Sequence, residues 1–368
     1  MHNQILTALE DTLSPHLDLS KSRLRTLAWL IVGMVNARTV NLSHIASQFC
    51  GDVQVSSSYR RLQRFFQYVR LDGGWLALVV VRLMKANPPW RLCLDRTNWK
   101  IGKRDVNILM LALLTRRARI PLMWTILNKA GNSSSTERIG LMRRYLALFG
   151  AGSIKLLLCD REFIGQNWIA FLQKHQIPFV IRVKKSAHVR FNDGRVYPLH
   201  CLIHKPCGIA RLKQLRGHLI AMAESDLPPL AFAAKRLVGG NILVVATNTN
   251  PQTALEAYRK RWLIECLFAD SKKRGLNMED TRLSNPKKLN TLLVVMALAM
   301  AWAYACATAS QGTKPIRTKK HGYRYKSWFR IGFDQLRKWI LHKPDKVADI
   351  WKNICPKRIA IRKITRVV

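Results

Sequence analysis

Acidic residues are scarce in this chain of 368 residues. Aspartate and glutamate together number 21 against 62 lysines and arginines, so the formal net charge at pH 7 is +41. The positive excess runs through the whole length and does not form a tail. Such a molecule needs a polyanionic partner, and DNA or RNA is the commonest one. A ribosome-associated protein, a membrane-surface protein, or charge kept for solubility alone are the alternative interpretations.

A complete zinc-binding pattern is missing. The stretch HCLIHKPC does gather histidine and cysteine, at His200, Cys201, His204 and Cys207. Its spacing fits no standard zinc pattern and a second CxxC half is absent, so no zinc site is expected. The role of this cluster stays open.

A basic start followed by an apolar run is also missing, so no signal peptide is expected. Other cysteines lie inside apolar runs, as small core residues of a reducing compartment do: Cys93, Cys159, Cys266 and Cys306. The apolar stretch Thr291–Ala309 is long enough to raise the question of a membrane span. Its alanine and methionine content, with Trp302 and Tyr304 inside it, favours a buried core helix. We therefore predict a cytoplasmic protein without a membrane span.

Residues 1–88 read as helices, over 23–35, 42–49, 56–69 and 75–85. Between the second and third of these, Gly51 offers a turn and the serines from Ser56 onward can cap the next helix. The pattern is typical of a helix-turn-helix, a motif that many helical bundles also imitate. The side chains it would offer to DNA are Tyr59, Arg60, Arg61 and Arg64.

From Trp90 the pattern changes to short runs rich in leucine, isoleucine and valine. Three successive antiparallel strands are expected at 91–94, 106–114 and 120–127, followed by a helix at 136–149 and a buried fourth strand at 154–159. A helix at 164–175 and a fifth strand at 178–183 follow. Residues 184–240 break this alternation with turn signals between short strand-like pieces, and a strand at 241–247 returns to the core. The predicted parts are 1–88 (helical, DNA-binding), 89–183 (α/β core, first part), 184–240 (β-rich insertion), 241–312 (core, second part) and 313–368 (basic tail).

Two aspartates stand out among the few acids because each ends an apolar run. Asp95 closes the run LCLD and Asp160 closes LLCD. An ionised carboxylate at the end of a buried strand is costly unless a positive or protic group compensates it. An aspartate after a strand also starts turns and caps helices, and Asp160 precedes a helix, so each alone has a structural explanation.

The basic stretch YRKRWLIECLFADSK, Tyr258–Lys272, holds a third acid of interest. Asn250 and Pro251 mark the start of its helix. At about 100° per residue, four side chains share one stripe about 60° wide: the phenol of Tyr258, the guanidinium of Arg261, the carboxylate of Glu265 and the ammonium of Lys272. A solvated helix face with an Arg261–Glu265 pair is the plain alternative.

Together these acids make a set of three carboxylates. Carboxylate oxygens are the ligands of hard divalent cations such as Mg²⁺ and Mn²⁺. Two such ions activate a nucleophile and stabilise a leaving oxygen in phosphodiester chemistry. Because a phosphodiester substrate is also what the charge of +41 would hold, two independent arguments converge on a metal-dependent enzyme acting on nucleic acid.

At these residues the chain resembles the bacterial insertion-sequence-four (IS-four) family of cut-and-paste DDE transposases. Tyr258, Arg261, Glu265 and Lys272 match that family's Y-x2-R-x3-E-x6-K signature, and LCLDRTNW and LLLCDREF resemble its two aspartate blocks. The resemblance covers residues 88–310. It implies an α/β fold with an RNase H-like core, a mixed sheet flanked by helices and interrupted by a β-rich insertion, beside the N-terminal all-α domain.

The resemblance also implies an activity. Asp95, Asp160 and Glu265 would be the catalytic and metal-binding residues and would hold two Mg²⁺ ions, for which Mn²⁺ is expected to substitute. Water would free a 3′-OH at the transposon end, a hairpin would form and reopen, and the 3′-OH would join target DNA. Tyr258, Arg261 and Lys272 would grip phosphates. The implied partners are double-stranded DNA, as terminal inverted repeats and as target, and a second copy of the chain in a homodimeric complex with DNA. The protein would be nucleoid-associated when bound.

One departure bears on the hairpin. Studied relatives place a tryptophan in the β insertion to stack on a flipped base, and this chain has no tryptophan between Trp168 and Trp262. Phe191, Tyr197 or Phe232 would have to serve. The chain is also short for the family, which puts a large C-terminal dimerisation domain in doubt. Another RNase H-like nuclease or resolvase, and a non-catalytic DNA-binding derivative of a transposase, remain as alternatives.

Overall fold

The computed structural model describes residues 2–49, 53–71, 74–101, 104–191, 193–202, 208–210, 216–219, 228–237, 240–320 and 322–353. Two compact units divide the chain. The unit that we call the helical unit comprises Met1–Leu71, Leu78–Ala86 and Thr291–Val368, and the unit that we call the sheet unit comprises Asp72–Ala77 and Asn87–Asn290. The five-part division expected from the sequence stays a prediction.

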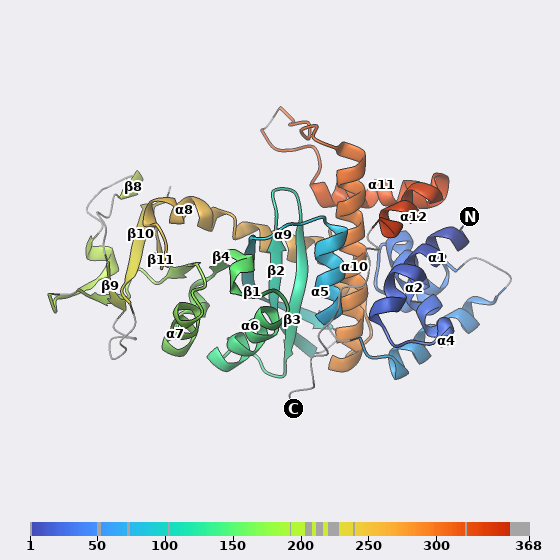
Figure 1. Ribbon diagram of the computed structural model, residues 1–368, viewed down its shortest axis with the longest axis horizontal. Helices are drawn as coiled ribbons and strands as arrows, with labels where there is room; N and C mark the ends of the chain where they lie inside the picture. Colours follow the sequence, from blue (N-terminus) through green and yellow to red (C-terminus); the bar gives the residue numbers. More distant parts are fainter. Residues whose placement is uncertain are drawn as a thin grey trace. The chain divides into compact units, whose positions relative to one another are not determined.

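The sheet unit is built on a mixed β-sheet (Figure 1). Strands β1 (Trp90–Ile101), β2 (Arg104–Leu114) and β3 (Arg119–Leu127) are antiparallel neighbours, as the alternating apolar runs predict. Strand β4 (Ile154–Cys159) then pairs in parallel with β1, and β5 (Phe179–Val183) in parallel with β4. The order is β3-β2-β1-β4-β5-β11-β10-β9-β6-β7, with β8 beside β10. The predicted mixed α/β sheet flanked by helices is confirmed.

Helices connect the parallel strands because such strands cannot be joined by a tight turn. Helix α6 (Ser135–Phe149) begins at a capping box, in which the Ser134 hydroxyl accepts from the Glu137 N–H and the Glu137 carboxylate accepts from the Ser134 N–H. Between β4 and β5 the chain makes a 3-10 turn (Arg161–Phe163) and then helix α7 (Gln166–Lys174).

The residues expected to form an insertion contribute further strands: β6 (His188–Arg190), β7 (Val196–Pro198), β8 (Gly208–Ala210), β9 (Arg216–Leu219) and β10 (Leu230–Arg236). Strand β10 pairs with β11 (Ile242–Thr247) over six residues, and β11 pairs with β5. The last strand of this region therefore extends the core sheet. The strand expected at 219–223 lies mostly outside the described residues.

The stretch that carries the predicted signature is two helices. Helix α8 (Pro251–Arg259) starts as predicted, with Pro251 at its first turn and the Asn250 side chain accepting from the Gln252 N–H. It ends at Arg259, and α9 (Trp262–Ser271) follows. At the joint, the N–H groups of Lys260 and Arg261 bond to carbonyls three residues back, which tightens the backbone into a 3-10 turn. The prediction of one continuous helix is therefore wrong.

The helical unit joins the first and last parts of the chain. It contains α1 (His2–Leu13), α2 (Lys21–Ala37), α3 (Leu42–Ala46), α4 (Val55–Tyr68), α11 (Trp328–His342), α12 (Pro344–Lys352) and most of α10 (Pro286–Gln311), while α5 (Gly74–Leu83) has residues in both units. Helix α1 packs against α12, where the Thr12 hydroxyl donates to the Trp351 carbonyl at 3.2 Å. Helices α10 and α11 approach so closely that a methyl group at Gly332 would overlap the Ala303 carbonyl.

Helix α10 contains the apolar run considered as a membrane span. Among the described helices, it is the one long and apolar enough to cross a membrane. In this structure 83% of its most apolar window is buried inside the protein, and Trp302 and Tyr304 are buried with it.

Candidate functional site

The register of the two central parallel strands places the predicted aspartates side by side. The last paired residues of β1 and β4 are Leu94 and Cys159, and each is followed directly by an aspartate. Asp95 is not at the end of its strand as predicted, because β1 continues to Ile101 against β2. It lies instead where the pairing of β1 with β4 stops. Asp160 follows the end of β4, as predicted.

One guanidinium links the first aspartate to the predicted glutamate. Arg261 donates to Asp95 Oδ2 at 2.6 Å and to Glu265 Oε1 at 3.1 Å. The second contact confirms the i,i+4 pair expected from the sequence. Helix α9 carries both Arg261, as its N-cap, and Glu265, and it packs on β1, β2 and β3. On its other side, the buried Asp270 pairs with Arg119 of β3 at 2.8 Å, which fixes the helix on the sheet.

The second aspartate is held by the same region of chain. The buried Tyr258 donates its hydroxyl proton to Asp160 Oδ1 at 3.0 Å, and Arg182 of β5 lies 3.9 Å from the same oxygen. Tyr258 and Arg261 therefore connect all three predicted carboxylates. Both were predicted to contact DNA phosphates; the structure gives each a carboxylate partner, and the phosphate contacts stay predictions.

Lys272 lies further along, at the C-cap of α9. Its ammonium donates to the Asn98 carbonyl of β1 at 3.0 Å and pairs with Glu279 at 3.3 Å. It lies at the same strand as Asp95 but contacts none of the three predicted carboxylates through the contacts the structure describes. The predicted stripe thus contacts β1 at Asp95 and at Asn98, and it contacts Asp160 after β4.

Burial sets the electrostatics of the site. It raises the pKa of the Asp95 carboxyl to about 7, against the opposing effects of the Arg261 cation and the Arg96 N–H, while Glu265 and Asp160 raise it further. Burial also raises the pKa of the Tyr258 hydroxyl, and the nearby Asp160 raises it again. Tyr258 therefore keeps its proton and acts as a donor.

The donor set fits a hard divalent cation. Three carboxylates influence one another, and two of them already share a cation, the guanidinium of Arg261. The neighbouring thiols of Cys93 and Cys159 are fully buried and have raised pKa values, so they do not compete as thiolate ligands. Among the described residues, no three histidine, cysteine, aspartate or glutamate side chains are already grouped as a metal cage. Arg261 instead joins Asp95 to Glu265, and Tyr258 holds Asp160.

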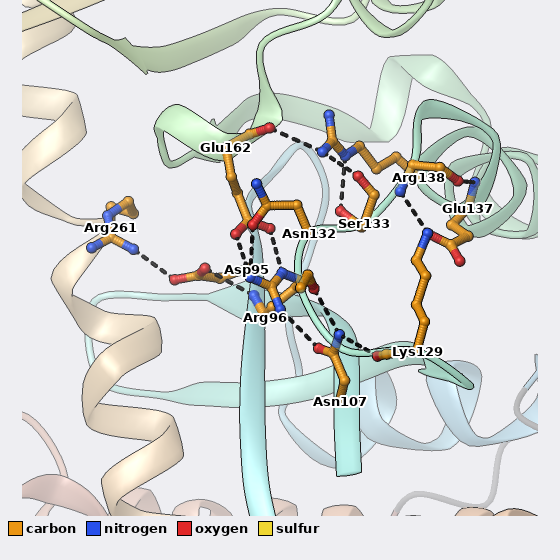
Figure 2. A network of polar contacts seen from close by, with 12 residues as sticks. Asp95, Arg96, Asn107, Lys129, Asn132, Ser133, Glu137, Arg138, Glu162 and Arg261 are labelled. Carbon is orange, nitrogen blue, oxygen red and sulfur yellow. Dashed lines mark hydrogen bonds and ion pairs between the residues drawn. The ribbon is translucent and has the colours of Figure 1, made fainter. Parts of the chain in front are cut away.

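Two residues that the sequence reasoning did not single out support this arrangement (Figure 2). Arg96, next to Asp95, forms a forked ion pair with Glu162, two residues after Asp160, at 2.7 and 2.8 Å. The pair ties β1 to the turn that follows β4. Their place in the sequence indicates a role at the site, because Arg96 lies inside LCLDRTNW and Glu162 inside LLLCDREF.

A wider network holds this pair in place (Figure 2). Arg96 also donates to the side chains of Asn107 and Asn132, and Asn107 donates to the carbonyls of Lys129 and Gly131. The buried Arg138 of α6 donates to the Glu162 carbonyl at 2.9 Å and lies over the Phe163 ring. The loop before α6, the turn after β4 and strand β1 are therefore cross-linked beside the aspartates.

The four side chains predicted to contact DNA from the helical unit lie on α4. Arg60 and Arg64 are exposed one turn apart, and Tyr59 is half-buried. Arg61 is turned onto α2, where it donates to the Thr26 hydroxyl at 2.8 Å and to the Ser22 carbonyl at 3.1 Å. In this structure Arg61 serves the packing of the helical unit.

Among the predicted base-stacking residues, Phe232 is fully buried and cannot receive a base. Tyr197 is 39% exposed and lies 6.1 Å, centroid to centroid, from Phe191. Trp262, which directly follows Arg261, is 66% exposed. In the HCLIHKPC cluster, Cys201 is exposed, and His204 and Cys207 lie outside the described residues.

A mixed sheet flanked by helices is consistent with an RNase H-like DDE domain. The sequence model of the family described as "Transposase DDE domain" matches residues 86–302. The chain belongs to this family of DDE transposases. No curated protein matches the chain.

Proposed function

We propose that this transposase cuts and joins DNA with Asp95, Asp160 and Glu265 as its catalytic carboxylates. The supporting observation is that one short segment carries Glu265 and contacts both aspartates: Tyr258 bonds to Asp160, and Arg261 bonds to Asp95 and to Glu265 itself. A segment that only covered the sheet would not need to bond to two aspartates in a chain with so few acids.

The three carboxylates would hold divalent cations, Mg²⁺ first, with Mn²⁺ as a substitute. When bound, these ions supply Lewis-acid activation of water or of a 3′-OH and charge stabilisation at the phosphate. The chain's own residues prepare the site. Arg261 compensates Asp95, whose ionisation is costly where it is buried. Tyr258 fixes the orientation of Asp160, and the Arg96–Glu162 pair holds the backbone on either side of the two aspartates in register.

The substrate proposed is double-stranded DNA, as the terminal inverted repeats of an insertion sequence and as target. The same proposal has four further parts. They are membership of the IS-four group, cut-and-paste transposition through a hairpin, a homodimeric complex with DNA, and a cytoplasmic, nucleoid-associated location. The signature residues and the charge of +41 support it. The 66% exposure of Trp262 beside Arg261 provides an aromatic surface for a flipped base.

The test is incubation with a duplex carrying the inverted repeats that flank the protein's own reading frame, in Mg²⁺, with products separated on a denaturing gel. Nicks, hairpins and joined strands give distinct bands. We expect Asp95→Asn, Asp160→Asn and Glu265→Gln each to abolish cleavage while DNA binding persists. Glu256→Gln is the matched control, because this exposed glutamate lies on α8 and belongs to none of the contacts above. Loss of binding in parallel with cleavage would make the acids structural and refute the proposal.

A further inference from the structure

A basic hairpin in the helical unit lies outside the residues that match the family. It spans residues 314–326, which we call the basic hairpin, and connects α10 to α11. In Figure 1 it projects beyond the C-terminal end of α10. From the sequence, these residues are expected to belong to the basic tail at 313–368.

Backbone contacts define its shape. Thr318 and Arg324 form an antiparallel bridge, the Tyr325 N–H donates to the Arg317 carbonyl at 2.8 Å, and the Lys319 N–H donates to the Tyr323 carbonyl at 2.8 Å. The turn closes at Gly322, whose φ of +82° favours glycine. Because side chains alternate across a two-stranded ribbon, one face carries two cations and two tyrosines. They are Arg317, Lys319, Tyr323 and Tyr325.

The charge of the basic hairpin is uncompensated at its tip. No aspartate or glutamate occurs between Asp280 and Asp334, whereas the hairpin itself contains six lysines and arginines. The last of these, Lys326, pairs with Asp334 of α11 at 2.9 Å and so fixes the base of the hairpin. Within the described part of the chain, no ion pair involves the other five: Lys314, Arg317, Lys319, Lys320 and Arg324.

The two tyrosine rings of the basic hairpin are exposed to solvent. Tyr323 is 75% exposed and Tyr325 is 57% exposed, and the ammonium groups of Lys319 and Lys326 lie 5.4 and 5.5 Å from the centre of the Tyr325 ring. Residues 312–320 and 322–325 are exposed except for the half-buried Ile316. A surface that combines exposed rings with unpaired cations suits a polyanion with flat apolar groups.

We propose that the basic hairpin is a second DNA-binding element that enters the major groove of duplex DNA. That groove admits a two-stranded β-ribbon, whose lysines and arginines then reach the phosphates on both sides. The choice of DNA as the polyanion rests on the proposed function. A second copy of this chain is a poor occupant, because it also carries a charge of +41.

The experiment measures binding of the full-length protein to a fluorescent duplex of arbitrary sequence across a range of salt concentrations. The test variant is Lys319→Gln/Lys320→Gln/Arg324→Gln. Each lost phosphate contact lowers the salt slope by about 0.9, so affinity at 0.1 M salt falls about 8-fold for one contact and up to about 500-fold for three. The control Lys338→Gln/Lys343→Gln/Lys346→Gln removes the same charge from exposed positions on α11, on α12 and at the residue between them, and its slope should change by less than one contact.

A second pair of variants tests the rings. Tyr323→Ala/Tyr325→Ala should weaken duplex binding at an unchanged salt slope, because no charge is lost. Tyr323→Phe/Tyr325→Phe keeps the rings and should bind like the wild type. Equal slopes for the lysine test variant and its control would overturn the proposal, as would a test variant that loses only self-association or the binding of an acidic protein.

The outcome is separable from that of the proposed function. If Asp95→Asn still cleaves DNA while the hairpin variant loses salt-dependent binding, the catalytic assignment fails and the hairpin stands. If Asp95→Asn abolishes cleavage while the hairpin variant binds like its control, the hairpin fails alone. Because the substituted side chains are exposed, thermal melting of each variant should match that of the wild type.

Discussion

Arg96 and Glu162 face each other as a forked ion pair, with Nε and the second terminal nitrogen of the guanidinium at 2.7 and 2.8 Å from the two carboxylate oxygens. Their side chains are only 14% and 17% exposed. Each is a near neighbour in sequence of one predicted catalytic aspartate. The pair therefore sets the separation of two acids that no direct contact joins.

Replacing Arg96 by lysine keeps the charge and removes the fork. Because charge-assisted hydrogen bonds of this kind contribute about 1.5–3 kcal/mol, we expect the free energy of unfolding to fall by about that amount. Cleavage should fall further than the lost stability explains, because Asp95 and Asp160 lose their common support. Urea unfolding and cleavage assays on the same preparation measure the two effects.

Arg25→Lys serves as the control, because Arg25 pairs with Glu10 in the helical unit at 2.8 Å. It should lower stability modestly and leave the cleavage rate of the folded protein unchanged. Equal losses of cleavage in both variants would show that Arg96 acts through stability alone.

The contribution of Asp95 to the stability of the metal-free protein should decrease as pH rises from about 4 to about 7. Asp95 has a pKa raised to about 7 in the folded protein, above its ordinary value near 4, so the folded state holds a proton that the unfolded state has released. The stabilisation is complete below the ordinary pKa and is lost as pH rises through the folded one, by up to about 1.4 kcal/mol per pH unit.

Asp95→Asn cannot titrate, so its stability relative to the wild type should rise across the same interval. Chemical unfolding of both proteins at pH 4, 5.5 and 7.5, in the presence of a chelator, measures the difference. A difference that does not change with pH would place the Asp95 carboxylate in a solvated position.

Tyr258→Phe removes one hydroxyl and one hydrogen bond, from Tyr258 to Asp160. We expect a loss of stability of about 1–2 kcal/mol, because the ring stays in place and Asp160 keeps Arg182 as a neighbour. If the hydroxyl orients Asp160, cleavage should fall while the affinity for DNA stays unchanged. Reduced affinity with unchanged single-turnover cleavage would instead place Tyr258 on a phosphate.

Lys272→Ala should lower the salt slope of end binding by about one phosphate contact. In the free protein the ammonium is paired with Glu279 and with the Asn98 carbonyl, so binding DNA requires an exchange of partners. Lys273→Ala, an exposed neighbour, is the comparison variant. If Lys272→Ala and the wild type had identical salt slopes, Lys272 would not contact a DNA phosphate, and its contacts to Glu279 and Asn98 would be its only role.

On α4, Arg60→Ala and Arg64→Ala should weaken DNA binding without changing the melting temperature, because both side chains are exposed. Arg61→Ala should lower the melting temperature, because it removes the hydrogen bonds to Ser22 and Thr26 on α2. Melting curves and duplex binding for the three variants separate the two roles. If all three variants lost DNA affinity equally and none changed its melting temperature, Arg61 would be a DNA-binding residue like Arg60 and Arg64.

The sequence was most informative where local periodicity and burial agree. The boundaries of β4 are predicted to the residue, because five of its six residues are apolar and four of these stand in a row, as in a buried strand. The cap at Asn250 and the pair between Arg261 and Glu265 followed from rules that act over a few residues. The two aspartates were found because an acid beside a buried strand needs a physical reason.

Long-range relationships escaped the same reasoning. The extension of β1 beyond Asp95 depends on its antiparallel partner β2. The break between α8 and α9 at Lys260 contains no proline or glycine, so the local sequence does not predict it. The Arg96–Glu162 pair spans 66 residues of sequence, a distance over which periodicity carries no information. The sequence predicts that Arg61 faces DNA, because its partner helix α2 lies about 35 residues earlier in the chain, beyond the range of local periodicity.

The contact between Thr12 and Trp351 spans 339 residues, so α1 meets its packing partner only after nearly all of the chain has been translated. The sheet unit, by contrast, ends at Asn290, and all the strands of its sheet are translated before that residue. On the ribosome the strands can therefore assemble while α1 still awaits α12. A premature stop before Pro344 would release chains with a complete sheet and an uncovered apolar surface on α1, which are natural targets for chaperones and proteases.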